Sequence, residues 1–359
     1  MSYHHPSCRH GLHCIIPPYL LDCLSNCIDV TAEVDINAWL GKTRAQSATL
    51  RGMRMGFEPG MATPGIVRTP TQGKTRRIFD AQNRGTSGLP GRLVRVEGQP
   101  PSGTTDLAVN EAYDHSGITY DFYKAVLERN SLDDRGMELV SSVHVGKSLN
   151  NAFWTGEQMA YGDGDGKLFT RFTRSLDVVG HELSHGVISY TADLVYQNES
   201  GALNEHFADV FGMLTRQWHT KTDAQNSDWL VGKDIMGPAA RARALRTFTA
   251  EKAYENDTYF GTDPQPKHVR DQYKGNDDNG GVHINSGIPN HAFYRFAIEL
   301  KGKAWETAGG LWYDTLLALQ SDAQFTDMAQ ATEKTAIDQY GRGSTVHLAL
   351  TAAWKAVGL

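Results

Sequence analysis

The sequence HELSH at residues 181–185 constrains the fold of this chain more than any other feature. Residues four apart lie on one face of an α-helix, so His181 and His185 can reach a single ion, whereas a strand would place them too far apart. With Ser175 as N-cap and Asp177 in the first turn, this segment is predicted to be a helix that carries two metal-binding histidines. Apolar residues recur there at helical spacing, at Leu176, Val179, Leu183, Val187 and Ile188.

Two histidines do not complete a catalytic zinc site, which usually has three protein ligands and one open position. Residues 201–214 predict a second helix with an apolar side and two carboxylates, Glu205 and Asp209, four apart on another side. Glu205 is the candidate third ligand. Asp209 could accept the second ring proton of a ligating histidine, and Asn204 is expected to support the ligands as well. His206 points about 100° away from Glu205 around the helix, which favours a surface or packing role.

Three motifs follow one another in a characteristic order: HELSH, GALNEHFAD at residues 201–209 and DNGGVHINSG at residues 278–287. Together they resemble the thermolysin family of zinc endopeptidases. The segments NNAFW at 150–154, YGDGDG at 161–166 and YTADLVYQNES at 190–200 extend this resemblance, which covers roughly residues 75–359.

The resemblance implies an α+β fold with two lobes, the zinc helices between them and the substrate in a cleft. We expect a β-rich catalytic lobe at 76–190, which includes the HELSH helix, and a helical lobe at 191–359. Strand-like runs occupy 77–80, 139–145 and 153–161, and helical patterns occupy 292–300, 311–319, 331–340 and 346–357.

The resemblance also implies metal-assisted peptide hydrolysis with one catalytic Zn²⁺, held by the two histidines and Glu205. Glu182 would take a proton from the zinc-bound water and return it to the leaving amine. His283 and Tyr196 would donate hydrogen bonds to the oxyanion that develops, and Asp278 would orient His283 as imidazolium.

Asn151 and the backbone of Ala152 are expected to pair with the substrate as an added strand. Arg246 aligns with the family arginine that binds the carbonyl after the cleaved bond, although Arg241 and Arg243 lie close enough to be alternatives. The pocket that receives the residue after that bond is apolar, which predicts cleavage before Leu, Ile, Val, Phe or Met. Its expected lining residues are Phe169, Phe172, Val178, Ile235 and Leu245.

The double calcium site of the family is predicted to be absent, with a single weaker ion left open. Only two of its acids remain, Asp177 and Asp228, whereas three aligned positions have become Arg216, Leu230 and Lys233. The two cations either pair with the remaining aspartates or lie exposed to solvent. The glycine-rich run at 162–166 lacks the loop length and terminal Glu of an EF-hand, so it predicts a tight turn rather than a calcium site.

The first 27 residues contain all four cysteines, Cys8, Cys14, Cys23 and Cys27, interleaved with histidines. A zinc knuckle, a thiol switch on the catalytic metal and reduced thiols in a discarded segment are the alternatives. The run IIPPYLL at 15–21 resembles the short propeptide of protealysin-like members of the family, so residues 1–50 are interpreted as a propeptide. No signal peptide is evident.

Residues 51–75 are interpreted as an exposed linker. We expect self-cleavage between about residues 45 and 75, where Thr49-Leu50, Gly56-Phe57 and Gly65-Ile66 match the predicted specificity. Residues 41–100 carry 11 Lys or Arg and three Asp or Glu, a net charge of +8 in a chain of net charge −6. This imbalance indicates a basic propeptide junction on an acidic enzyme. No nucleic-acid motif accompanies it, so nucleic-acid binding is not expected.

The expected partners are protein and peptide substrates and the chain's own propeptide. No run of about 18 apolar residues suggests a membrane span, and a monomer is expected. The family resemblance favours an extracellular location, with cytoplasmic action as the alternative. Two other functions stay open on the sequence alone: a zinc-binding precursor with an adhesive or interaction role, and a zinc hydrolase that acts on another acyl bond.

Overall fold

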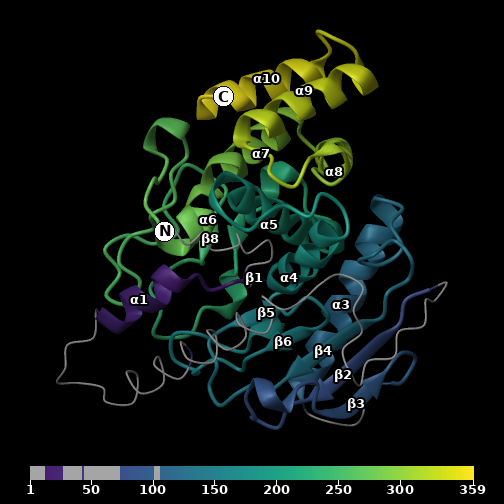
Figure 1. Ribbon diagram of the computed structural model, residues 1–359, viewed down its shortest axis with the longest axis vertical. Coiled ribbons are helices and arrows are strands. Elements are labelled where there is room, and N and C mark those ends of the chain that lie inside the picture. Colours follow the sequence, from purple (N-terminus) through teal and green to yellow (C-terminus); the bar gives the residue numbers. More distant parts are fainter. Residues whose placement is uncertain (1–12, 27–42, 44–72, 101–105) are drawn as a thin grey trace, which may run out of the picture.

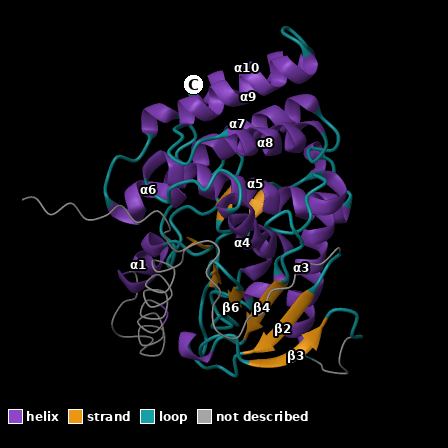
Figure 2. Cartoon of the chain, turned by 45° about the vertical axis from the view of Figure 1, so that its right-hand side comes forward, coloured by secondary structure: helices purple, strands orange, loops and turns teal. Residues whose placement is uncertain are grey.

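A computed structural model describes residues 13–26, 43, 73–100 and 106–359 of this chain. A β-sheet forms the lower part of the molecule in Figure 1, and a stack of helices forms the upper part. Two helices, α4 (Leu176–Ser189) and α5 (Asn198–Thr220), run between these parts. The expected α+β, two-lobed architecture is confirmed, and Figure 2 shows the same division between strands and helices.

Six strands make the sheet, in the order β1-β5-β6-β4-β2-β3. Strand β4 is parallel to both of its neighbours, whereas the outer pairs are antiparallel. The strands are β1 (His13–Cys14), β2 (Arg76–Asp80), β3 (Arg92–Val96), β4 (Leu139–Val143), β5 (Ala152–Trp154) and β6 (Met159–Tyr161). The single strand expected over 153–161 is wrong, because the Thr155 amide donates to the Gln158 carbonyl at 3.0 Å and turns the chain into a hairpin.

Helix α3 (Leu107–Val126) packs against the sheet and against α4, and the sequence patterns singled out above did not include it. Asp106 caps its first turn by accepting the Val109 amide at 3.3 Å. Ala108, Val109 and Ala112 are buried, so one face of α3 completes the core of the first lobe. In the sequence, the Asp106 cap followed by apolar residues at helical spacing could have predicted this helix.

His144 joins the start of α3 to the glycine-rich turn after β6. Its Nε2 lies 3.0 Å from Asp106 Oδ2, and its Nδ1 lies 2.8 Å from Asp163 Oδ2. A histidine between two carboxylates donates from both nitrogens only when it is protonated. The hydrogen bond to Asp163 and the one to Asp106 raise the pKa of His144 to about 9, despite the opposing effect of burial.

We expect this raised pKa to make stability fall at alkaline pH. The protonated ring stabilises the fold fully below the unfolded pKa of about 6.5, and this contribution is lost as pH rises through about 9. Between pH 6 and pH 10, wild type should lose about 2 kcal/mol more unfolding free energy than His144→Gln, measured by urea denaturation. Asp163→Asn should remove part of the difference, and parallel pH curves for wild type and His144→Gln would contradict the assignment.

The second lobe is mainly helical, and the four helices expected near the C-terminus are present. Its helices after α5 are α6 (Asp277–Asn285), α7 (Gly287–Leu300), α8 (Thr307–Ala318), α9 (Phe325–Tyr340) and α10 (Thr345–Val357). A short antiparallel pair, β7 (Leu230–Val231) and β8 (Arg246–Thr247), also lies in this lobe. This pair positions Arg246, which the helical pattern alone does not place.

The N-terminal segment (residues 13–26) packs on both lobes. Strand β1 pairs with β5 at the edge of the sheet, and helix α1 (Pro18–Asn26) contacts α6 of the second lobe. Figure 1 shows α1 beside α6 and β1 beside β5. Its apolar side chains Ile15, Ile16, Leu20, Leu21 and Leu24 are buried in the main core.

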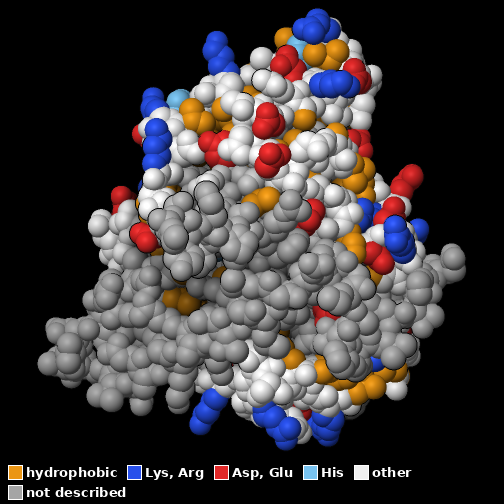
Figure 3. All heavy atoms as spheres, in the orientation of Figure 1, with side chains coloured by type: hydrophobic (Ala, Val, Ile, Leu, Met, Phe, Trp, Pro, Cys, Tyr) orange, Lys and Arg blue, Asp and Glu red, His pale blue; other side chains and the backbone are white. Residues whose placement is uncertain are grey.

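The part of the chain that the structure describes holds no helix long and apolar enough to cross a membrane. The face of the molecule shown in Figure 3 carries both acidic and basic side chains. The expected cleavage positions at 49–50, 56–57 and 65–66 lie outside the described residues, as do Cys8, Cys27, both ends of the proposed propeptide and the start of the proposed linker.

Candidate active site

Helices α4 and α5 carry the proposed metal ligands and cross in close contact. A Cβ at Gly180 would lie 3.0 Å from the Gly212 Cα, and a Cβ at Gly212 would lie 2.4 Å from the Asp177 carbonyl oxygen. Two glycines therefore allow the helix backbones to approach closely. Ser175 stands at the N-cap of α4 as expected, but its hydroxyl donates to the Asp177 side chain instead of capping the helix backbone.

The structure brings His181, His185 and Glu205 together in the buried space between these helices. Their potential ligand atoms all lie within 4.8 Å of one another. The two Nε2 atoms are 3.0 Å apart, and Glu205 Oε2 lies 3.5 Å from His181 Nε2. Glu205 Oε2 is buried and receives no hydrogen bond, so one of its lone pairs is left for another partner.

The opposite ring nitrogens determine which atoms face this space. His181 Nδ1 lies 2.8 Å from Asp209 Oδ1, and His185 Nδ1 lies 2.8 Å from Asn204 Oδ1. Asn204 donates its Nδ2 to the Leu194 carbonyl at 3.1 Å, which fixes Oδ1 as the acceptor. The Nδ1 atoms then carry the protons, so both Nε2 lone pairs point at Glu205. Three converging electron pairs in a buried site fit a divalent cation such as zinc.

Asp209 is held by two further side chains. Arg246 donates to both of its oxygens, at 3.0 Å and 2.8 Å, and Asn290 Nδ2 donates to Oδ2 at 2.9 Å. Arg246 and the His181 imidazole together hold the pKa of Asp209 well below its usual range, although burial opposes them. The sequence singled out Asp209 and Arg246 separately but did not link them, and it missed Asn290, which comes from helix α7.

Glu182 is buried beside the three ligands. Its Oε2 accepts the Trp154 backbone amide at 2.8 Å, and its Oε1 receives no hydrogen bond. Burial and the neighbouring Glu205 carboxylate raise the pKa of Glu182 above its ordinary value. A carboxylate with a raised pKa accepts a proton more readily near neutral pH, which is the property required of a general base.

His283, Tyr196 and Asp278 form a second group next to Glu205. Asp278 accepts from His283 Nδ1 at 2.6 Å, and the Tyr196 hydroxyl lies 3.2 Å from His283 Nε2 and donates to Glu205. Burial lowers the pKa of His283, but the Asp278 and Glu205 carboxylates outweigh it and raise that pKa overall. Asp278 reaches His283 because residues 278–281 all adopt left-handed backbone angles, which Gly280 and Gly281 accommodate.

The N-terminal segment lies against this group of residues. The Ile15 amide donates to the Ala152 carbonyl at 3.4 Å, and the Ile16 amide donates to Asn151 Oδ1 at 3.0 Å. Arg246 Nη1 donates to the Ile15 carbonyl at 3.0 Å. Its neighbours Arg241 and Arg243 are exposed, so among these three arginines the structure places Arg246 at the site.

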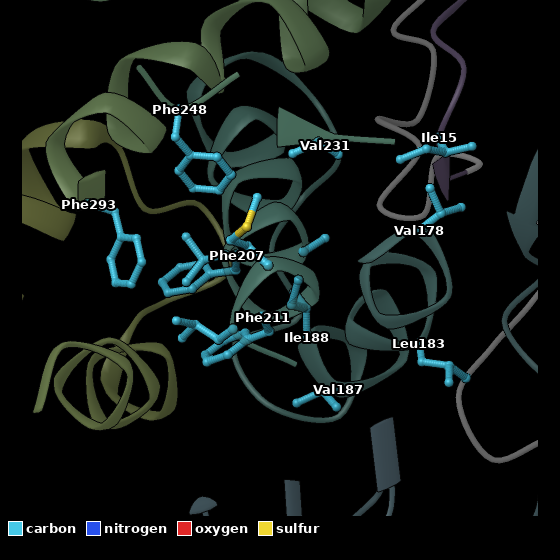
Figure 4. Close-up of a cluster of buried hydrophobic side chains, with 14 of the residues drawn as sticks. Ile15, Val178, Leu183, Val187, Ile188, Phe207, Phe211, Val231, Phe248 and Phe293 are labelled. Carbon is cyan, nitrogen blue, oxygen red and sulfur yellow. The ribbon is translucent and has the colours of Figure 1, made fainter. Parts of the chain in front are cut away.

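The five apolar residues expected to line the specificity pocket are all buried in the main core. This cluster also contains Ile15, and Figure 4 shows Ile15 and Val178 among its members. The rings of Phe169 and Phe172 have centroids 5.8 Å apart. The structure thus places an apolar side chain of the N-terminal segment in the same cluster as the proposed pocket residues, which are Phe169, Phe172, Val178, Ile235 and Leu245.

Of the two alternatives for the altered calcium positions, ion pairs or exposure to solvent, the structure shows ion pairs, with Lys233 half exposed as well. Arg216 Nη1 lies 3.5 Å from Asp177 Oδ2, and Lys233 Nζ lies 3.2 Å from Asp228 Oδ2. Arg216 also pairs with Asp228, so the guanidinium joins the two remaining acids.

Two further predictions concern polar residues outside the metal site. In the glycine-rich run, Asp165 Oδ1 accepts three backbone amides, from Lys167, Leu168 and Phe169, which confirms a tight turn. His206 is fully buried between Asn290 and Trp312, so it has the packing role and not the surface role.

Comparison with known proteins gives the family. A family model described as "Thermolysin metallopeptidase, catalytic domain" matches residues 69–189, and one described as "Thermolysin metallopeptidase, alpha-helical domain" matches residues 192–359. The chain belongs to the thermolysin family. It is therefore a metalloprotease that hydrolyses peptide bonds, and the family is zinc-dependent.

Individual relatives agree with this assignment. Protease PrtS of Photorhabdus sp. (strain Az29) is 50% identical over 351 residues, which cover 96% of this chain and 91% of the relative. An extracellular metalloprotease of Pectobacterium carotovorum subsp. carotovorum is 44% identical over 294 residues, which cover 81% of this chain and 83% of the relative. The solved precursor of protealysin from Serratia proteamaculans matches with a TM-score of 0.83 and 42% identity, over 96% of this chain and 99% of that one.

Proposed function

We infer that this thermolysin-family protease is a neutral endopeptidase that is made as a latent zymogen and cleaves before bulky apolar residues. The observation that carries this proposal is the buried set of His181, His185 and Glu205, with Glu182 next to His181 in the chain and His283 Nε2 3.5 Å from Glu205 Oε1. Every residue that the family's chemistry requires at these positions is intact, which leaves nothing to favour a purely adhesive role.

The chain's own groups divide the reaction between them. His181, His185 and Glu205 would hold the zinc ion, which polarises the substrate carbonyl and acidifies a bound water when present. Glu182 would accept the proton of the attacking water and return it to the leaving nitrogen. His283 and Tyr196 would donate to the oxygen on which negative charge develops, and Asp278 keeps His283 oriented for this role.

The apolar pocket supports a specificity that a peptide library can test. We expect the processed enzyme to cut peptides with Leu, Ile, Val, Phe or Met after the cleaved bond at least about tenfold faster than peptides with Lys or Asp there. A charged side chain would lose its hydration among Phe169, Phe172 and Val178, which are fully buried. The measurement is kcat/KM for peptides that differ at this one position. A preference for Lys or Asp would exclude the proposed pocket.

Latency is supported by the N-terminal segment, which occupies the residues proposed to bind substrate. Removal of residues 1 to about 45–75 by the enzyme itself would then release the cleft, and the similarity to a protealysin precursor is consistent with this proposal. Two relatives of the chain are proteases, one of them named as extracellular, which supports an extracellular site of action. The proposed partners are protein and peptide substrates and the propeptide, with the enzyme as a monomer.

We also propose that Arg216 and Lys233 replace the charge of the family's double calcium site. Selective removal of calcium should then shift the melting temperature by less than about 2 °C, while removal of zinc abolishes activity. Arg216→Ala should destabilise the protein by about 1–3 kcal/mol, because Asp177 is buried and would lose this cation. Lys233→Ala is the matched control, since its ammonium is half exposed and should contribute under about 1 kcal/mol. A large loss of stability on calcium removal would contradict the replacement.

A further inference from the structure

The N-terminal segment is bound in the orientation that a substrate requires, and not merely over the site. Strand β1 runs antiparallel to β5, with Cys14 opposite Phe153 and His13 opposite Trp154. After β1 the pairing continues through Ile15 to Ala152 and through Ile16 to Asn151. These contacts use main-chain groups of the segment, so they fix which of its peptide bonds lies next to the ligands.

The two ends of the Cys14–Ile15 peptide bond meet the two kinds of group that hydrolysis needs. The Cys14 carbonyl oxygen lies 3.0 Å from His283 Nε2, the proposed oxyanion donor. On the other side of the bond, the Ile15 amide donates to the Ala152 carbonyl of β5. The same strand holds Glu182, the proposed base, through the Trp154 amide at 2.8 Å, and β1 also contacts helix α4, which carries Glu182. The carbonyl oxygen is therefore near the oxyanion donor, and the nitrogen that would leave is bound to the strand that holds the proposed base.

Neighbouring bonds of the segment do not meet this condition. The Ile15 carbonyl is bound by Arg246, and the Ile16 carbonyl accepts from Asn151 Nδ2 at 3.3 Å. Ile15 itself is a fully buried, bulky apolar residue, and it directly follows the Cys14–Ile15 bond, as the proposed specificity requires. The register of the N-terminal segment on β5 and the apolar side chain of Ile15 thus both point to the Cys14–Ile15 bond.

We propose that this active site hydrolyses the Cys14–Ile15 bond of its own chain, which makes the N-terminal segment a slow substrate as well as an obstruction. This inference rests on the proposed endopeptidase function. Glu182 takes one proton from water, the water oxygen bonds to the Cys14 carbonyl carbon, and the C–N bond breaks with its electron pair on nitrogen. Glu182 then delivers its proton to that nitrogen. The second proton of the water passes from the new carboxyl group to the amine, so the products are a carboxylate on Cys14 and an ammonium on Ile15, with one water consumed.

The packing explains why this cut differs from activation. Ile16, Leu20, Leu21 and Leu24 stay buried in the core on the Ile15 side of the bond. The cut detaches β1 from the chain but leaves α1 held against the second lobe. The shortened chain keeps the contacts of Ile15 and Ile16 with Arg246 and Asn151, so processing of the linker is still needed to empty the site.

The test uses purified full-length protein loaded with zinc, followed over time by intact mass and N-terminal sequencing. We expect a chain or fragment that begins at Ile15, formed at a rate independent of protein concentration because the bond lies in the same molecule. Glu182→Gln should slow its formation at least about a hundredfold. Ile15→Asp should slow it at least about tenfold. A new terminus at Ile16 or elsewhere in 13–18, or equal cutting in Glu182→Gln, would overturn the proposal.

Two measurements keep this inference separate from the proposed function. Hydrogen exchange on zinc-loaded Glu182→Gln should show protected Ile15 and Ile16 amides, because the structure pairs both with β5 and Asn151; rapid exchange at both would refute the register without any activity assay. A synthetic peptide of residues 8–21 should be cut by the processed enzyme between Cys14 and Ile15. If the enzyme digests the peptide library but leaves this bond intact in both formats, the inference fails while the endopeptidase function stands.

Discussion

Replacement of Glu182 by Gln should lower peptide hydrolysis by about a thousandfold or more and leave the chain at full length after expression. Gln keeps the shape of the side chain and can still accept the Trp154 amide, but it cannot take a proton from water. The measurements are kcat/KM on a peptide with Leu after the cut, and intact mass of the purified protein. Peptide hydrolysis and self-processing should be lost together, because the same base is proposed to act on external substrates and on the chain's own linker.

The control for this variant must show that the fold and the metal site survive. Zinc content and melting temperature of Glu182→Gln should match wild type, since His181, His185 and Glu205 are untouched. Glu251→Gln, an exposed carboxylate paired with Arg243, should keep full activity and normal processing. Efficient maturation of Glu182→Gln in a protease-deficient host would show that another enzyme removes the propeptide.

Gly212→Ala should destabilise the protein by about 3 kcal/mol and weaken zinc binding, because it forces α4 and α5 apart. The added Cβ would lie 2.4 Å from the Asp177 carbonyl oxygen and 2.9 Å from the His181 backbone nitrogen. Both contacts are with backbone, which cannot rotate away. Since two ligands come from α4 and the third from α5, a shift between the helices spreads the ligand set. Urea unfolding and zinc titration, both in the Glu182→Gln background to prevent processing, measure the two effects.

Gly310→Ala is the matched control for that substitution. Gly310 lies in helix α8, and a Cβ there meets no atom within 4 Å. Alanine is the better helix former by about 1 kcal/mol, so this change should leave stability unchanged or raise it slightly. If Gly212→Ala behaved like Gly310→Ala, the close helix contact would not be what holds the ligands together.

Local spacing made the centre of the site predictable from sequence. His181 and His185 lie one turn apart on one helix, so their convergence follows from helix geometry alone. Glu205 could be predicted as the third ligand because a second helix with a suitably placed carboxylate follows closely in the sequence. The resemblance to the family then supplied His283, Tyr196 and Arg246, which are distant in sequence and which no periodicity connects to the histidines.

Long-range contacts were not predictable in the same way. Asn290 binds Asp209 from 81 residues away, and nothing in its surrounding sequence marks it as part of the site. The two contacts of His144 require strand β4 to bring its ring between Asp106 and Asp163, and the alternation of residues along the strand does not reveal this. Helix α3 was not predicted, although Asp106 before an apolar run could have indicated its start.

The position of β1 at the end of the sheet has a consequence for the mature enzyme. If that strand is removed, as proposed, β5 becomes the outermost strand of the described sheet and exposes main-chain donors and acceptors that can pair with an extended chain. An exposed sheet edge makes other β-proteins prone to aggregate. In this enzyme the same edge is proposed to bind the substrate. If substrates pair with β5 as proposed, each bound peptide would take the place of the sixth strand, and each release of product would leave the edge of β5 open again.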